Sequence, residues 1–556
     1  MADEYTFAKS LAPQDTDFEF DTRQFIYIPD QNNSSYPNGQ VQFDLAGLSN
    51  SGKFIDWSQS FIQVPLVLNV NSSAGAFSGT SAENNFAASL KNHVYQLVHS
   101  MDIQLSNNSI CNLTSFSNLD INYKILNKMS TEEIENLAPT ILFGKDTAES
   151  ITYTSAASAS GLGEQNNVID ETALSTANGW GYTQNKGRAE RMKYTSFDPD
   201  STQATNFTTA QLTGNVGKNY MTKTTTNITY YVLATLRLKD LHDVFDKLPL
   251  IRGAYFRITL NLNTQCKATH TLGGTGTTYD SITVQSPNNV LPFMLSPLGN
   301  GFVAGGTSTE IVASLGISKS LVPDGTFSHP TMNQCRLYAC AYTMSPVYEE
   351  KYFSMVPTKR VLYNDILTFQ ELNVAPSANV NWLITNGVSR ARYLIMYPMI
   401  SSVLNGSNPL KNASSFSAGV ACGTPMNSPF SSCPGTTAPY ANISNFNILL
   451  SGSALFQSNI QYKFEQFLEE NRSSVGLNGG MTSGMSSGLI GASDFEAGYG
   501  FVYVDLSRKI SQASDDISRS IQAVFTNNSS SAMDYYCVVG YEREIVVSTS
   551  TGSLVI

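Results

Sequence analysis

The sequence predicts an all-β protein made of two tandem units, and three observations support that prediction. Strand-like runs dominate, such as "FIQVPLVLNV", "TYYVLATLRL" and "RARYLIMYPMI", and several alternate apolar and polar residues with the period of a β-strand. Charged residues make up only 14% of the chain and aromatic residues 11%, which favours sheets joined by polar loops. The third observation is that the order of elements occurs twice.

This internal repeat matches the two halves of the chain element by element. "MDIQLSNNSICNLTSFSNLDINYKILNK" begins at residue 101 and "FNILLSGSALFQSNIQYKFEQFLEE" at residue 446. Each is typical of a strand, a polar turn, a short strand and a helix. "YYVLATLRLKDL" and "GFVYVDLSRKI" match next, followed by the final strands "GAYFRITLNLN" and "DYYCVVGYEREIVV". We therefore expect two sandwiches or barrels, each about half of the 556 residues.

Helical patterns are few and short. In "LKDLHDVFDKL" an apolar stripe from Leu238 to Leu248 includes Phe245, so we expect one amphipathic helix with Phe245 buried. "STEEIENLAPTIL" opens with a capping box formed by Ser130 and Glu133. "IQYKFEQFLEE" is the third helical pattern.

Charge and hydropathy argue against two classes of partner. The net charge is −11, and the first 22 residues contain one Lys and six acidic residues. Because a basic arm is missing, we expect no direct nucleic-acid binding. The sequence has no run of 18 or more apolar residues and no apolar signal region at its start, so we expect no membrane span and no secretion signal.

"GMSSG", residues 484–488, has the G-x-S-x-G form of the nucleophile elbow of esterases. That elbow needs a strand before the serine, a helix after it, and a histidine later in the chain. The segment before Ser486 is not strand-like, and all five histidines precede it: His93, His99, His242, His270 and His329. We interpret "GMSSG" as part of a connecting loop.

Two further groups could bind a metal ion. "HDVFD" offers His242, Asp243 and Asp246, which we interpret as the solvated face of a short helix. Cys335 and Cys340 fit no common zinc spacing, and seven cysteines in so long a chain do not indicate a disulfide framework. We interpret these two as buried, reduced thiols on a strand. We expect no catalytic, cofactor-binding or metal site, and no cofactor.

Several segments resemble the double jelly-roll major capsid proteins of icosahedral double-stranded DNA viruses, most closely those of polinton-like viruses and virophages. "ATLRLKDLHDVFDKLPLIRGAYFRITLNLN" resembles the end of the first roll in that family. "NGVSRARYLIMYP", "SPFSSCPGTTAPYANISNFNILLSG" and "FVYVDLSR" resemble parts of the second roll. The resemblance covers most of the chain and is weakest over 144–227 and 267–330. It implies two tandem eight-stranded antiparallel jelly rolls with few helices and long loop insertions.

The resemblance also implies a domain division and a function. The first jelly roll would span 1–270, with a loop insertion at about 144–227, and a connector and the second roll would span 271–556. The chain would be a major capsid protein and not an enzyme, forming pseudo-hexagonal homotrimers that tile an icosahedral shell. Its partners would be its own copies, neighbouring capsomers, and penton and minor capsid proteins, in a virion assembled inside the host cell.

Two other classes of function stay open at this point. A viral fibre or a carbohydrate-binding β-sandwich adhesion protein would also be rich in strands and polar loops. A β-sandwich hydrolase is the third possibility, which the order of Ser486 and the histidines disfavours.

Overall fold

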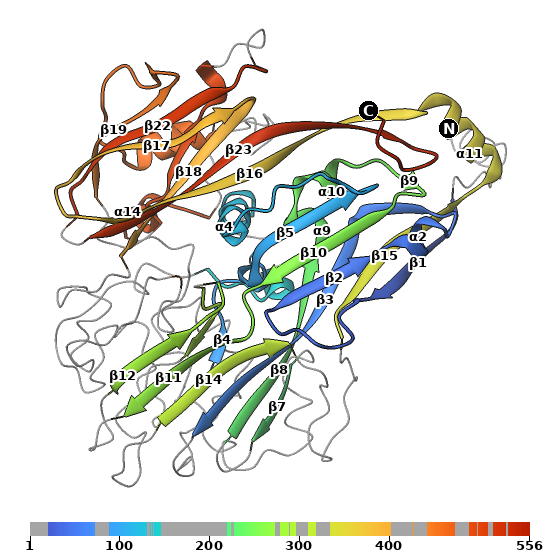
Figure 1. Ribbon diagram of the computed structural model, residues 1–556, viewed down its shortest axis with the longest axis horizontal. Helices are drawn as coiled ribbons and strands as arrows, with labels where there is room; N and C mark the ends of the chain where they lie inside the picture. The colour runs from blue at the N-terminus through green and yellow to red at the C-terminus, as the bar shows by residue number, and fades with distance from the viewer. Residues whose placement is uncertain are drawn as a thin grey trace, which may run out of the picture.

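The structure is a computed structural model of two β-sandwiches (Figure 1). It describes the following residues: 20–72, 88–129, 134, 136, 138–145, 219–223, 227–272, 279–288, 290–295, 310–317, 334–401, 426, 442–472, 489–497, 499–509, 515–529 and 532–555.

The second sandwich shows the pairing in its simplest form. One sheet has the strand order β16-β23-β18-β21 and the other has the order β17-β22-β19-β20, with antiparallel neighbours. Numbered along this unit, the sheets contain strands 1-8-3-6 and 2-7-4-5, which is a jelly roll. The strands are β16 (Thr358–Val374), β17 (Asn379–Val388), β18 (Ala391–Ile400), β19 (Ile443–Leu450), β20 (Ser453–Ala454), β21 (Val502–Asp505), β22 (Arg519–Asn527) and β23 (Met533–Ser548).

The first sandwich has the same topology. Its strands pair in the order β1-β15-β3, with β8 also paired to β3, and in the order β2-β10-β5-β6. The predicted pair of tandem jelly rolls is therefore confirmed. The eight strands are β1 (Phe20–Pro29), β2 (Gln40–Asp44), β3 (Phe54–Ser72), β5 (Val98–Leu105), β6 (Asn108–Ser109), β8 (Asn227–Arg237), β10 (Phe256–Leu262) and β15 (Arg336–Met344).

Additional strands extend the first roll. The hairpin strand β7 pairs with β8, the short β9 pairs with β3, and β14, β11 and β12 continue the sheet beside β3. A separate ribbon pairs β4 with β13. The bounds of these strands are β4 (Ala88–Leu90), β7 (Asn219–Lys223), β9 (Ile251–Arg252), β11 (Cys266–Leu272), β12 (Tyr279–Gln285), β13 (Phe293–Leu295) and β14 (Glu310–Ile317).

The prediction that the first roll ends at residue 270 does not fit this pairing. β15 is hydrogen-bonded to both β1 and β3, so it completes the first sheet. "GAYFRITLNLN" contains β10, the seventh strand, and not the final strand of the first roll as predicted. The insertion of β11 to β14 between the seventh and eighth strands hid this. We propose that the first roll extends to Met344 and that helix α11 (Pro346–Met355) links it to the second.

The remaining matches of the internal repeat are confirmed. β5, β6 and helix α4 (Ser117–Lys128) occupy the places of β19, β20 and helix α12 (Phe464–Arg472). β8 likewise corresponds to β21. The strand orders of the two rolls also make β3 the counterpart of β18. Most of the insertion predicted at 144–227, residues 146–218, lies outside the described residues, as does the capping box of Ser130 and Glu133.

The predicted single helix over "LKDLHDVFDKL" is two short helices, because His242 between them has an extended backbone with φ −150°. These are α9 (Leu238–Leu241) and α10 (Asp243–Lys247). Phe245 is buried as predicted, with its ring 6.1 Å from Trp57 and 6.0 Å from Phe256. The other short helices are α2 (Ala46–Ser49), η1 (Val94–Leu97), η2 (Ala138–Ile141), α14 (Ala492–Ala497) and η6 (Ser507–Lys509).

The two rolls share one continuous apolar core, in which buried residues of both units pack together. The long strands β16 and β23 extend from the second roll over the first (Figure 1). Within the described ranges, no helix has the length and apolar character needed to cross a membrane.

Candidate functional site at the junction of the two rolls

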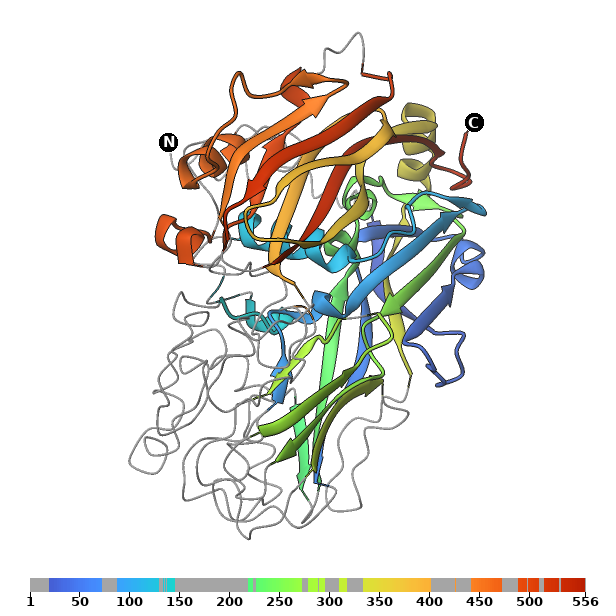
Figure 2. The same ribbon diagram turned by 60° about the vertical axis from the view of Figure 1, so that its left-hand side comes forward.

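Helix α4 of the first roll lies between the two sandwiches, as Figure 2 shows, and packs on the outer face of the β16-β23-β18-β21 sheet. Tyr393 and Tyr397 of β18 project from that sheet toward α4 and are fully buried. The hydroxyl of Tyr393 donates to Asp120 Oδ1 at 3.1 Å, and that of Tyr397 donates to the carbonyl oxygen of Leu119 at 2.6 Å. These bonds satisfy the polar ends of two large apolar rings.

Aromatic stacking continues this contact along α4. Tyr123 lies nearly parallel to Tyr503 of β21, with centroids 5.5 Å apart and planes at 4°, and meets Phe501 edge-on at 5.6 Å. Gly540 of β23 leaves space for the ring of Tyr393, since a Cβ on residue 540 would lie 2.2 Å from Cζ of that tyrosine. The second roll therefore presents an aromatic outer face that the first roll covers.

A second part of the junction is centred on Asp365 of β16, whose side chain is fully buried. Its Oδ2 accepts hydrogen bonds from Arg543 Nη1 at 2.9 Å, the hydroxyl of Tyr541 at 3.2 Å and the backbone N–H of Asn112 at 3.1 Å. Arg543 and Tyr541 belong to the second roll, whereas Asn112 belongs to the first. The carboxylate therefore ties both rolls together.

The other oxygen of Asp365 is also occupied. Oδ1 accepts from the backbone N–H of Ile366 at 2.8 Å and lies 3.5 Å from Nε2 of His242. The Nδ1 atom of His242 accepts the backbone N–H of Val244 at 3.2 Å, which caps α10. Since Nδ1 is an acceptor, the ring proton lies on Nε2 and points to the carboxylate.

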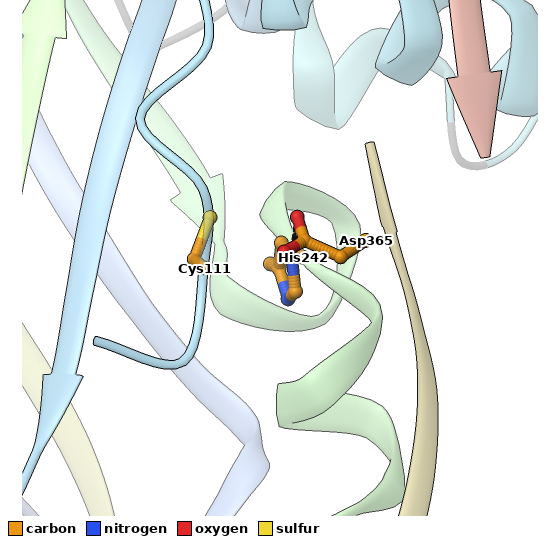
Figure 3. Close-up of side chains that lie close together, drawn as sticks. All are labelled: Cys111, His242 and Asp365. Carbon is orange, nitrogen blue, oxygen red and sulfur yellow. Dashed lines mark hydrogen bonds and ion pairs between the residues drawn. The ribbon is translucent and has the colours of Figure 1, made fainter. Parts of the chain in front are cut away.

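Cys111, His242 and Asp365 could be considered as a metal site, because their possible ligand atoms lie within 4.8 Å of one another (Figure 3). Cysteine, histidine and carboxylate are all zinc ligands. Here, however, both ring nitrogens of His242 and both oxygens of Asp365 hold protein hydrogen bonds, and the Arg543 cation already balances the carboxylate. Burial raises the pKa of the Cys111 thiol, which opposes the thiolate that a metal requires. The cluster therefore fits a structural role, and not the binding of a metal ion.

The structure places the metal candidates of the sequence differently from our prediction. His242 is buried, so its interpretation as part of a solvated face is wrong. Asp243 Oδ2 accepts the backbone N–H of Asn364 at 3.0 Å, and Asp246 is half-exposed beside Lys247. His242 and Asp246 therefore have separate surroundings and do not share a site.

The other candidates have simpler outcomes. Cys335 and Cys340 are free, buried thiols at and within β15, which confirms their interpretation. His93, His99 and His270 lie in the first roll, in the stretch before η1, in β5 and in β11. Ser486 and His329 lie outside the described residues.

A third part of the junction is formed by the C-terminal residues. The backbone N–H of Arg252, in the first roll, donates to the carbonyl oxygen of Thr549 at 3.1 Å. Gly552 has φ +64°, and a Cβ on it would lie 2.3 Å from the backbone of Ala254. The chain after β23 can approach the first roll this closely only because residue 552 is glycine.

The comparisons with known proteins identify the fold. Neither a family model nor a curated protein sequence matches this chain. Among solved structures, the Sputnik virophage structure determined by cryo-EM matches at 13% identity over 97% of this chain and 88% of that chain, with a TM-score of 0.54. The mavirus major capsid protein matches at 12% identity over 96% and 89%, with a TM-score of 0.43. The Faustovirus major capsid protein matches at 11% identity over 96% and 92%, with a TM-score of 0.40.

The chain has the double jelly-roll fold. The resemblance inferred from the sequence, to capsid proteins of virophages and related viruses, is therefore confirmed at the level of the fold.

Replacing Asp365 by Asn should destabilise the protein by about 3 kcal/mol, because it leaves the partly buried Arg543 without its anion. The matched control is Asp516→Asn, which removes an exposed partner of Arg390 and should cost under about 1 kcal/mol. Urea unfolding measures both. Equal losses of unfolding free energy in the two variants would show that Asp365 stabilises the protein no more than an exposed ion pair does.

The same variant has a pH signature. Burial alone would raise the pKa of Asp365, but hydrogen bonds from His242, Arg543 and Ile366 outweigh it and hold the pKa below its ordinary value. A lowered pKa adds stability that is fully present above the unfolded-state value and is lost as pH falls through the folded-state value. The stability difference between wild type and Asp365→Asn should therefore shrink below about pH 4. A difference that grew in acid would contradict this sign.

Gly552→Ala should cost several kcal/mol, because the new methyl group meets the backbone of Ala254 and the residue keeps a positive φ. Gly452→Ala is the control, since Gly452 also has a positive φ of +80° but a Cβ on it would have nothing within 4 Å. The control should cost only about 1 kcal/mol, from the strained backbone. Thermal unfolding of both variants separates the steric cost of the methyl group from the cost of the strained backbone. Similar melting temperatures would mean that residue 552 does not pack closely on Ala254.

Proposed function

We propose that this chain is a major capsid protein, a structural subunit that forms pseudo-hexagonal homotrimers which tile an icosahedral viral shell. The observation that carries the proposal is the fold, two fused jelly rolls whose likeness to the Sputnik virophage structure extends over 97% of the chain. In the proposed role the protein resides in the virion and assembles inside the host cell. Its partners are its own copies, neighbouring capsomers, and penton and minor capsid proteins.

The geometry of the two rolls supports this proposal physically. The chain contains two units with the same topology, side by side, so its two halves have nearly the same structure. Three such chains arranged about a threefold axis present six similar walls, which pack on a near-hexagonal lattice. Such packing needs a rigid junction, because a flexible link between the rolls would let the angle between successive walls vary.

The chemistry of the junction also favours a structural role. Its titratable groups are engaged with one another, as Asp365 is with Arg543 and His242, and this engagement leaves them poorly suited to acid or base catalysis. An adhesion protein or viral fibre is the alternative, but the full-length likeness to a virophage structure favours the capsid role.

Size-exclusion chromatography with light scattering tests the assembly state. The purified chain of 60.5 kDa should elute with the mass of three copies at micromolar concentration, and negative-stain images should show uniform hexagonal particles. Stable monomers, or rod-shaped particles, would contradict the proposal and favour the fibre.

A further inference from the structure

The outer face of the first roll is rich in aromatic side chains that are exposed or half-buried. Phe25 and Tyr27 of β1 are 47% and 58% exposed, which is high for such large apolar residues. With Phe61 of β3 and with Tyr338 and Tyr342 of β15 they form what we call the aromatic face. Within the described part of the chain, β1 pairs with β15 alone.

Four members of this face, Phe25, Phe61, Tyr338 and Tyr27, form a continuous row of ring contacts. Ring centroids are 5.7 Å apart between Phe25 and Phe61, 5.0 Å between Phe61 and Tyr338, and 6.3 Å between Tyr338 and Tyr27. Two arginines lie over this row: Arg23 over Phe25 and Tyr342, and Arg336 over Tyr27. A continuous exposed apolar patch of this kind marks an interaction surface.

The internal repeat shows what covers the equivalent surface in the second roll. β1, β15 and β3 correspond to β16, β23 and β18. On those strands the outward aromatic residues, Tyr393, Tyr397 and Tyr536, are buried, and α4 with the segment before it lies over them. One copy of this face is therefore covered within the chain, whereas Phe25 and Tyr27 of the other copy remain exposed.

The repeat also identifies the element that should cover the open copy. Aligning Ser117-Asn118-Leu119 with Ser458-Asn459-Ile460 relates α4 and its entry to residues 457–472. Leu119, Asp120 and Tyr123, which contact the second roll, correspond to Ile460, Gln461 and Phe464. By the same alignment, Phe116 and Asn127 correspond to Gln457 and Leu468. All five residues of the second roll are exposed or half-buried, and we call them the docking stripe: Gln457, Ile460, Gln461, Phe464 and Leu468.

Charge is complementary between the two surfaces. Arg23 and Arg336 lie on the aromatic face, and next to the docking stripe the exposed Glu465 and Glu469 outnumber the exposed Lys463. Opposite charges around an apolar contact favour one orientation of the partner and speed association.

We propose that the docking stripe of a second copy of this chain packs on the aromatic face of the first, so that each contact between chains repeats the junction within a chain. This inference rests on the proposed homotrimer and names its interface. The contact is head-to-tail, because the second roll of one copy meets the first roll of the next, and three copies close it into a ring.

The test is a double variant, Phe25→Asp with Tyr27→Asp, in the full chain. Both residues are exposed in the isolated chain, so the fold should persist, whereas two carboxylates in a buried contact should prevent assembly. Light scattering should show a change from three copies to one, with near-ultraviolet circular dichroism unchanged. The control is Leu383→Asp on β17, which is 54% exposed and lies outside both surfaces, and it should remain trimeric.

Each outcome has one meaning. If the wild type is a monomer, the proposed trimer itself fails. If the wild type is a trimer and the double variant stays a trimer, the aromatic face is not the interface and is covered by another partner or segment, which overturns this inference alone.

A second measurement covers the case in which the double variant misfolds. Tyr27→Cys combined with Gln461→Cys should yield covalent multimers with a short bismaleimide, well above the level given by either single variant or by the native cysteines of the wild type. Linkage only within single chains, or none, would overturn the inference.

Discussion

The structure depends on covering one surface, the aromatic outer face of the second roll. A jelly roll normally keeps its apolar side chains between its two sheets, with polar residues outside. The second roll carries Tyr393, Tyr397 and Tyr503 on the outside, and water would be a poor environment for them. Helix α4 removes that surface from solvent and joins the two sandwiches through one continuous core.

Apolar burial stabilises the junction, and the hydrogen bonds of Asp365 fix the orientation of one roll relative to the other. Stacked rings such as Tyr123 and Tyr503 tolerate sliding, because the hydrophobic effect has no direction. A buried carboxylate that needs donors from both rolls tolerates very little, since any shift leaves a charge without partners. The angle between the rolls is thereby fixed.

Much of this fold could be predicted from the sequence, and the failures have physical causes. The match between "SNLDINYK" and "SNIQYKFE" reported a real equivalence of two helices, because the same turn and helix entry recur in both rolls. The domain boundary failed because the insertion between β10 and β15 resembles a linker in composition. Asp365 and Arg543 were missed because they are 178 residues apart and neither belongs to a local motif. His242 was misjudged because its burial comes from β16, far along the chain.

One junction geometry, on this account, is used both within and between chains, and a cryo-EM structure of the assembled protein tests that claim most directly. Superposing β16, β23 and β18 of one copy on its own β1, β15 and β3 should carry α4 onto the α12 of the neighbouring copy. If α4 superposes on that α12, the contact between chains repeats the junction within a chain. If α12 instead points to solvent, or a different protein covers Phe25 and Tyr27, the repeated-junction account is contradicted, even if the particle is a trimer.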